Sequence, residues 1–104
     1  MGFFKNILGL GPSVDYKDLM SKGALIIDVR SKAEYQGGHI KGSTNIPLPE
    51  LQSYLSKIPK TEKPIITCCA SGMRSESAKK TLEKNGYSEV YNGGSWFNLQ
   101  GKLY

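Results

Sequence analysis

Residues 64–78 contain the feature that most restricts how this chain can fold and react. The apolar run Pro64-Ile65-Ile66-Thr67 predicts a short buried strand, and a helical pattern begins near Ser75. Between them lies a loop that carries two adjacent cysteines followed by Gly72 and Arg74. The chain must therefore fold so that a thiol at the end of a strand faces the start of a helix.

This loop combines the residue types that activate a thiol and bind an anion. Gly72 permits unusual backbone angles, and the amides of a tight loop then point inward. Arg74 supplies a fixed positive charge, and the helix start supplies unpaired N–H groups with a partial positive charge. Such surroundings lower the pKa of a cysteine from about 8.5 toward neutrality. The pattern predicts a nucleophilic cysteine, whereas a cysteine after a strand without these neighbours is most often a core residue.

Length and cysteine content restrict the architecture and the compartment. The 104 residues suit one domain, which we place at residues 13–104 after an N-terminal extension of residues 1–12. This extension matches a signal peptide poorly, and no apolar run reaches the roughly 18 residues of a membrane span. The two cysteines are adjacent and cannot join distant segments. We therefore expect a cytoplasmic protein in a reducing environment.

Charge and motif content restrict the partners. The net charge of +5, from 14 basic and 9 acidic residues, suits small anionic substrates or an acidic protein partner. The lysines are scattered without interleaved aromatic residues, so nucleic-acid binding is not expected. Gly2 begins an N-myristoylation pattern that Asn6 breaks, so no membrane anchor is expected. The sequence has no metal-ligand cluster and no nucleotide-binding loop, so we expect neither a metal nor a cofactor.

Strand patterns alternate with helix patterns along the chain. The predicted strands cover residues 24–29, 44–46, 65–68 and 88–91. Helices are predicted from about residues 15 to 22, 31 to 36, 48 to 55, 75 to 84 and 95 to 99. Residues 92–94 are predicted as a turn. This alternation predicts an α/β fold with a mostly parallel sheet, helices on both faces, and a ligand site at the carboxyl ends of the strands.

Four motifs in order resemble the rhodanese superfamily of sulfurtransferases. They are Asp28-Val29-Arg30 with Glu34-Tyr35, Gly38-His39-Ile40-Lys41-Gly42-Ser43 with Asn45-Ile46-Pro47, Cys69-Ala70-Ser71-Gly72-Met73-Arg74-Ser75, and Val90-Tyr91-Asn92-Gly93-Gly94 with Trp96. The resemblance covers about residues 13 to 100. It implies a rhodanese-like sheet of about five mostly parallel strands flanked by helices.

The resemblance also implies an activity and places it on Cys69. In this family the cysteine takes sulfane sulfur from a donor such as thiosulfate and forms a persulfide. A thiophilic acceptor, which is cyanide, a thiol or a protein, then removes that sulfur. The substrate-binding loop would be Ala70, Ser71, Gly72, Met73 and Arg74, with its backbone amides around the outer sulfur.

Cys68 leaves alternatives open. Counted from Cys68, the loop to Arg74 has the C-x5-R length of cysteine phosphatases, some of which share the rhodanese fold. We favour Cys69 because Gly72 then takes the position of the sulfurtransferase glycine, and Thr67 replaces the histidine common before a phosphatase cysteine. Cys68 is then expected to be a buried residue without a disulfide. A sulfur carrier that serves a partner protein remains a further alternative, and a catalytically inactive regulatory domain is disfavoured by the intact loop.

Several nearby residues have structural interpretations. Asp28 and Arg30 are expected to form an ion pair, with Arg30 near the pocket mouth. His39, the only histidine, lies between glycines and is expected to be structural rather than a general base.

The remaining expectations concern residues around the loop. Ser75 is expected to cap the following helix, and Trp96 and Phe97 are expected to lie in the core. The short side chains of Ala70 and Ser71 predict a small, open pocket.

Overall fold

One parallel sheet forms the centre of the computed structural model, which describes residues 13–104. The predicted extension at residues 1–12 lies outside the described residues. Within residues 13–104 the sheet has four strands, all parallel to their neighbours, in the order β2-β1-β3-β4. The strands are β1 (Leu25–Asp28), β2 (Thr44–Asn45), β3 (Ile65–Cys69) and β4 (Val90–Ser95). The α/β class is confirmed, and the described sheet has one strand fewer than the resemblance implied.

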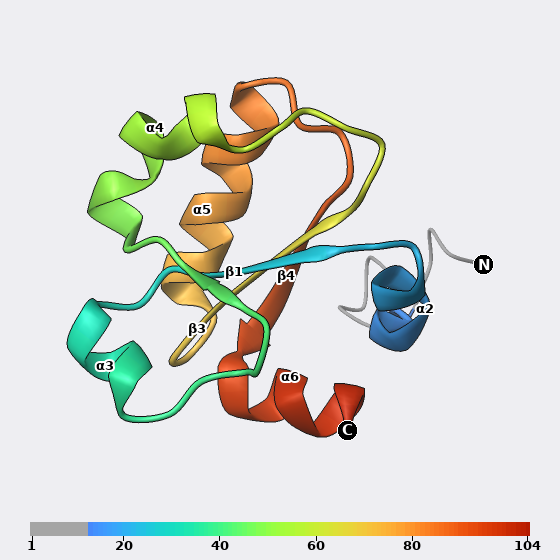
Figure 1. Ribbon diagram of the computed structural model, residues 1–104, viewed down its shortest axis with the longest axis vertical. Helices are drawn as coiled ribbons and strands as arrows, with labels where there is room; N and C mark the ends of the chain where they lie inside the picture. The colour runs from blue at the N-terminus through green and yellow to red at the C-terminus, as the bar shows by residue number, and fades with distance from the viewer. Residues whose placement is uncertain (1–12) are drawn as a thin grey trace, which may run out of the picture.

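The helices lie on both sides of this sheet, as predicted (Figure 1). They are α2 (Tyr16–Ser21), α3 (Lys32–Gln36), α4 (Leu51–Tyr54), α5 (Met73–Lys84) and α6 (Trp96–Leu103). Side chains cap three of their amino ends, because Asp15, Ser31 and Ser95 each accept a backbone N–H three residues ahead. The helix predicted at residues 48–55 is instead the short α4 between two 3-10 turns, Leu48–Glu50 and Leu55–Lys57.

The core is divided into two layers because strand side chains alternate between the two faces of the sheet. On one face, Ile27 and Ile65 pack with Leu51 of α4 and Leu82 of α5. We call this the α5 face. On the opposite face, which we call the α2/α6 face, the packed side chains include Tyr16, Leu19, Ile26, Ile66 and Leu99. Cys69 belongs to the first cluster and Cys68 to the second, so the adjacent thiols lie on opposite faces.

Strand β4 differs from the prediction, because residues 92–94 continue it to Ser95 instead of forming a turn. Gly93 explains the difference. A Cβ at Gly93 would lie 2.9 Å from Cγ2 of Ile66 and 2.9 Å from Cδ2 of Leu99, so this glycine permits close packing of β4. The β3–β4 register shifts between Thr67 and Cys69, which pairs Cys69 with Ser95. The end of β4 therefore lies beside the cysteine.

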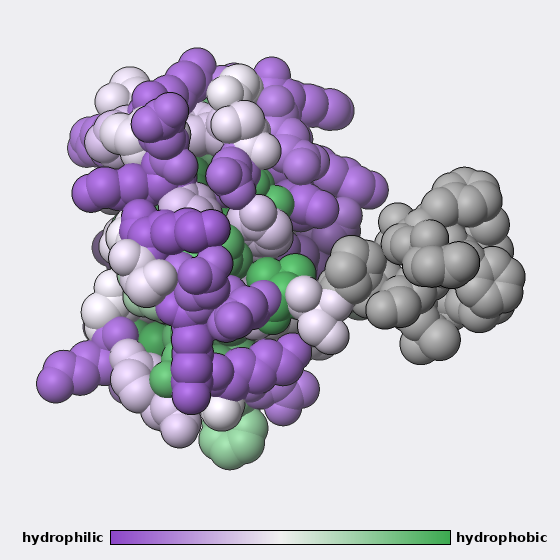
Figure 2. All heavy atoms as spheres, turned by 90° about the vertical axis from the view of Figure 1, so that its right-hand side faces the viewer, coloured by the Kyte–Doolittle hydropathy of each residue, from purple (hydrophilic) through white to green (hydrophobic). Residues whose placement is uncertain are grey.

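The surface is largely hydrophilic on the face that Figure 2 shows, with hydrophobic groups visible between the polar side chains. Phe97 is 69% exposed, so its predicted place in the core is wrong. Trp96 is half-buried and packs against the α2/α6 cluster. Among residues 13–104, no helix has the length and apolar character needed to cross a membrane.

Candidate active site

The predicted reactive loop lies at the carboxyl end of β3, where parallel α/β sheets bind their ligands. Cys69 ends the strand, and α5 begins four residues later at Met73. Gly72 makes this short connection possible. Its φ of 103° lies in the left-handed region, where a side chain would be strained, and a Cβ would lie 3.5 Å from Cα of Gly94. The loop therefore turns back over the end of its own strand and lies against β4.

Hydrogen-bond donors converge on the sulfur of Cys69. The backbone N–H of Gly72 donates to Sγ at 2.9 Å, and the N–H of Ser75 donates at 3.4 Å. The Ser75 hydroxyl oxygen also lies 3.4 Å from Sγ. Burial raises the pKa of Cys69, but the hydrogen bonds from Ser75, Gly72 and Ser71 lower it, and the net pKa is below that of an ordinary cysteine. The site therefore stabilises a thiolate.

The pocket around Cys69 is closed, so the predicted small, open pocket is wrong. The side chain of Cys69 has 0% exposure, whereas Ala70, Ser71 and Met73 are exposed above it. Met73 alone is 80% exposed. A molecule that reacts with Sγ can therefore reach it only when the loop of residues 70–72 moves.

Ser75 lies in the first turn of α5 and does not cap it, because the helix begins two residues earlier than predicted. Its hydroxyl donates to Oδ1 of Asn92 at 2.6 Å. Asn92 in turn donates from Nδ2 to the Gly72 carbonyl at 3.2 Å and to Oε1 of Glu76 at 3.1 Å. One side chain from β4 thus holds both the loop and the serine beside the thiol.

The role of Asn92 is not predicted from the sequence, because residues 92–94 carry the pattern of a turn. A signal was present. Asn92 directly follows a predicted strand that should pair in the same parallel sheet as the cysteine strand.

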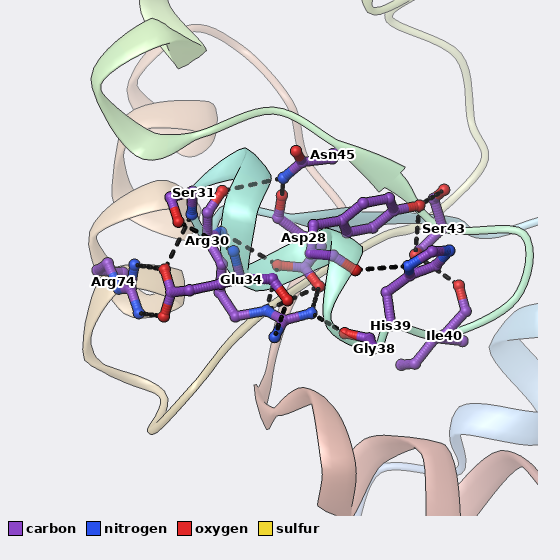
Figure 3. Close-up of polar contacts among 11 residues, drawn as sticks. Asp28, Arg30, Ser31, Glu34, Gly38, His39, Ile40, Ser43, Asn45 and Arg74 are labelled. Carbon is purple, nitrogen blue, oxygen red and sulfur yellow. Dashed lines mark hydrogen bonds and ion pairs between the residues drawn. The ribbon is translucent and has the colours of Figure 1, made fainter.

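Arg74 forms an ion pair with Glu34 of α3, as Figure 3 shows. Nη1 of Arg74 donates to Oε1 of Glu34 at 2.7 Å, and Nη2 donates to Oε2 at 2.9 Å. Glu34 also accepts the Ser31 N–H at 3.0 Å, and the two residues form a capping box at the start of α3. The hydrogen bonds from Arg74 and then the Ser31 amide lower the pKa of Glu34 to about 2. A contact between Arg74 and a bound anion stays a prediction.

Asp28 and Arg30 form the expected ion pair, and both are buried. Nη2 of Arg30 donates to Oδ2 of Asp28 at 2.7 Å and to the Gly38 carbonyl at 2.7 Å (Figure 3). The guanidinium carbon lies 4.7 Å from the ring centroid of Trp96. Arg30 therefore fastens β1 to the segment before β2.

His39 agrees with its structural interpretation. Its ring stacks on Tyr35 with centroids 3.7 Å apart, and Nδ1 lies 2.7 Å from the Tyr35 carbonyl oxygen. These contacts fix the turn after α3.

Cys68 is buried on the α2/α6 face, as predicted, and both cysteines are free thiols. Burial and the charge of Asp28 raise the pKa of Cys68 to about 12. A protonated thiol on the face opposite the loop is a poor nucleophile for the phosphatase alternative. No group of three or more potential metal ligands occurs within residues 13–104.

The model of the Rhodanese-like domain family matches residues 13–99. This chain belongs to the rhodanese family. The match extends from just before α2 into α6 and includes the whole described sheet and the cysteine loop.

Similar proteins include some named as thiosulfate sulfurtransferases and others with less specific names. The chain is 46% identical over 69 residues to the "uncharacterized protein YqhL" of Bacillus subtilis. The aligned residues are 66% of this chain and 54% of YqhL. It is 39% identical over 67 residues to the "putative sulfur carrier protein YrkF" of the same organism, covering 64% of this chain and 36% of YrkF. It thus spans about half of one relative and about a third of the other. The thiosulfate sulfurtransferase GlpE of Ectopseudomonas mendocina is 32% identical over 83 residues, which are 80% of this chain and 75% of GlpE.

The solved structure of the human single domain sulfurtransferase TSTD1 has the same fold. It superposes with a TM-score of 0.70 at 29% identity, covering 88% of this rhodanese and 97% of the human chain.

Proposed function

We propose that this rhodanese transfers sulfane sulfur through a persulfide on Cys69. The observation that carries the proposal is the set of donors from Gly72 and Ser75 around Sγ, which holds the pKa of the thiol below its ordinary value. A thiolate is the form that attacks a sulfane sulfur. Membership of the rhodanese family supports the reaction class.

With thiosulfate as the donor, the reaction balances in two steps. The Cys69 thiolate attacks the outer sulfur of thiosulfate, so that a new S–S bond forms while the old one breaks. Sulfite leaves with the electron pair, and Cys69 carries a persulfide anion. A thiophilic acceptor, such as cyanide or a thiolate, then bonds to the outer sulfur, and the electron pair of the S–S bond returns to Cys69. The reaction requires no cofactor.

The persulfide is proposed to lie in the loop formed by Ala70, Ser71, Gly72, Met73 and Arg74. An anionic outer sulfur is stabilised by N–H donors and by the partial positive charge at a helix start. The Gly72 amide and the start of α5 are already directed at Sγ. The reducing cytoplasm is the proposed compartment, because the reaction needs a free thiol.

A second candidate function is sulfur relay to or from a partner protein. The specific observation that favours it is the complete burial of Cys69 beneath an exposed rim that includes Met73. A protein partner that contacts this rim has the means to move the loop. The similarity to a putative sulfur carrier protein is consistent with this candidate.

The deciding experiment measures the intact mass of the protein after incubation with thiosulfate and maps any added sulfur by peptide. We expect one sulfur atom on Cys69, which cyanide removes. Cys68→Ser should retain this gain, and Cys69→Ser should lose it. If no sulfur is added while Cys69 still reacts with iodoacetamide, thiosulfate is not the donor. Hydrolysis of an aryl phosphate that is lost in Cys68→Ser would instead establish the phosphatase.

A further inference from the structure

The only charged side chain in the predicted substrate loop, Arg74, is already bound by a carboxylate. Glu34 engages both terminal nitrogens of its guanidinium at 2.7 and 2.9 Å, which is the geometry that an oxyanion would use. The chain has one other arginine, Arg30, and that side chain is buried against Asp28. Neither arginine therefore offers an unpaired positive charge to a substrate in this structure.

Glu34 is held in place from two sides, and Figure 3 shows it between α3 and Arg74. Its Oε1 accepts the Ser31 N–H at 3.0 Å as part of the capping box, so the side chain is fixed to its own helix as well as to Arg74. The pKa of about 2, set by Arg74 and Ser31, keeps this carboxylate ionised throughout the neutral range. Its negative charge is thus a permanent part of the loop surroundings.

Arg74 stands in the first turn of α5, directly before Ser75, whose N–H donates to Sγ of Cys69 at 3.4 Å, so its charge belongs to the surroundings of the thiol. An incoming anion meets this arginine together with its carboxylate partner, and the two charges largely cancel. The cancellation matters more for a donor with two negative charges than for a donor with one, because the Coulomb energy scales with the charge.

We propose that Glu34 is a specificity-determining residue, which makes the site discriminate against dianionic sulfur donors in favour of singly charged or neutral ones. The inference rests on the proposed sulfur transfer and names the class of donor that this site prefers. Thiosulfate, a dianion, is then a slower donor than an equally sized monoanion or a persulfide of a thiol.

The test uses two donors that differ in charge but not in reaction. Methanethiosulfonate has the shape of thiosulfate, with a methyl group in place of one charged oxygen, and releases methanesulfinate instead of sulfite. For wild type and Glu34→Gln we would measure kcat/KM with both donors and cyanide as acceptor. We expect the ratio of thiosulfate to methanethiosulfonate to rise about fivefold in Glu34→Gln, a modest gain because the pair is 39% and 38% exposed. The gain should shrink at high salt.

Two control variants identify the source of the effect. Glu62→Gln changes the net charge equally at an exposed residue before β3, at the opposite end of the strand from Cys69, and should leave the donor ratio unchanged. In an Arg74→Gln background the Glu34→Gln substitution should give no gain, since no guanidinium remains to be released.

A second readout does not depend on sulfur transfer. Iodoacetate and iodoacetamide alkylate a thiolate by the same displacement, but only iodoacetate is charged. Glu34→Gln should raise the ratio of their rates at Cys69. Because both reagents need the loop to move, the effect of that movement on the two alkylation rates cancels in their ratio. A raised alkylation ratio without any sulfur transfer would support the effect of Glu34 on anions and defeat the proposed function.

Sulfur transfer with both ratios unchanged would overturn the inference and leave the proposed function intact. An equal rise for charged and uncharged reagents would also overturn it, because Glu34 would then restrain the loop without selecting by charge.

Discussion

On the α2/α6 face of β3, Cys68 lies among apolar side chains and near the Asp28 carboxylate, and its pKa is raised to about 12. One residue further along, on the α5 face, Cys69 meets the Gly72 and Ser75 amides, and its pKa is lowered. Both side chains have 0% exposure. The two thiols thus share a strand and a degree of burial but differ in their hydrogen-bond donors.

The difference shows that burial alone does not decide whether a cysteine reacts. Burial raises the pKa of both thiols. At Cys69 the backbone N–H donors of Gly72 and Ser75 outweigh the effect of burial on the pKa, and Cys68 has no such donor in the described structure. The alternation of side chains along a strand therefore separates a packing cysteine from a reactive one within a single peptide unit.

The largest predicted effect compares the two thiols directly. At pH 7, Cys69→Ala should lose about a thousandfold or more of the rate of iodoacetamide alkylation, because a thiol with a pKa of about 12 is almost wholly protonated. Cys68→Ala should retain the wild-type rate. The rates are measured by mass spectrometry of the folded protein. Comparable losses in the two variants would remove the proposed difference between the faces.

The next effect tests whether the α2/α6 face serves packing. Gly93→Ala should lower the free energy of unfolding by about 2 to 3 kcal/mol, because its Cβ would lie 2.9 Å from both Ile66 and Leu99. Gly94→Ala is the matched control. Its Cβ meets nothing within 4 Å, but its φ of 79° is strained for alanine and should cost about 1 kcal/mol.

Urea unfolding measures both glycine variants, and alkylation of Cys69 is followed in parallel. A Gly93→Ala protein as stable as wild type would show that β4 can move away from the core. An altered pH midpoint for Cys69 alkylation in the folded variant would show that the two faces are not independent.

The features that depend on local residue patterns, namely the strands and the choice of cysteine, could be predicted from the sequence. The alternation of strand and helix patterns located all four described strands, and the position of Gly72 together with Thr67 favours Cys69 over Cys68. The contacts of Glu34 with Arg74 and of Asn92 with Ser75 were missed, because they join residues 40 and 17 positions apart. Such pairs depend on how helices are placed around the sheet. The closed loop over Cys69 was missed for the same reason, since short side chains do not reveal how a backbone folds over them.

A smaller effect concerns stability above pH 8. An unfolded cysteine loses its proton near pH 8.5, whereas folded Cys68 keeps its proton until about pH 12. The unfolded state therefore binds fewer protons than the folded state in this range, and stability falls as pH rises. Cys69 changes the stability in the opposite direction, because its pKa is lowered in the folded state. Its contribution to the free energy of unfolding is fully present above the pKa of the unfolded thiol and is lost as the pH falls.

Cys68→Ala should remove the loss of folding stability that Cys68 causes at alkaline pH. Relative to wild type, its free energy of unfolding should gain on the order of 2 kcal/mol between pH 8 and pH 10. Urea unfolding across this range measures the difference, in which the titration of other groups cancels. Parallel curves for the two proteins would mean that Cys68 ionises in the folded state as an ordinary cysteine does.

The smallest effect tests the donors on the α5 face. Ser75→Ala removes the hydroxyl that lies 3.4 Å from Sγ of Cys69, which lowers the pKa of the thiol when it turns its proton from Oδ1 of Asn92 toward the thiolate. The midpoint of the alkylation rate against pH should move to higher pH, and the rate at pH 7 should fall about threefold to tenfold. Ser77→Ala, at an exposed position of the same helix, should leave the profile unchanged. An unmoved midpoint in Ser75→Ala would assign the lowered pKa to the backbone amides alone, and the difference between the two faces would then arise from the fold of the loop, with no contribution from this side chain.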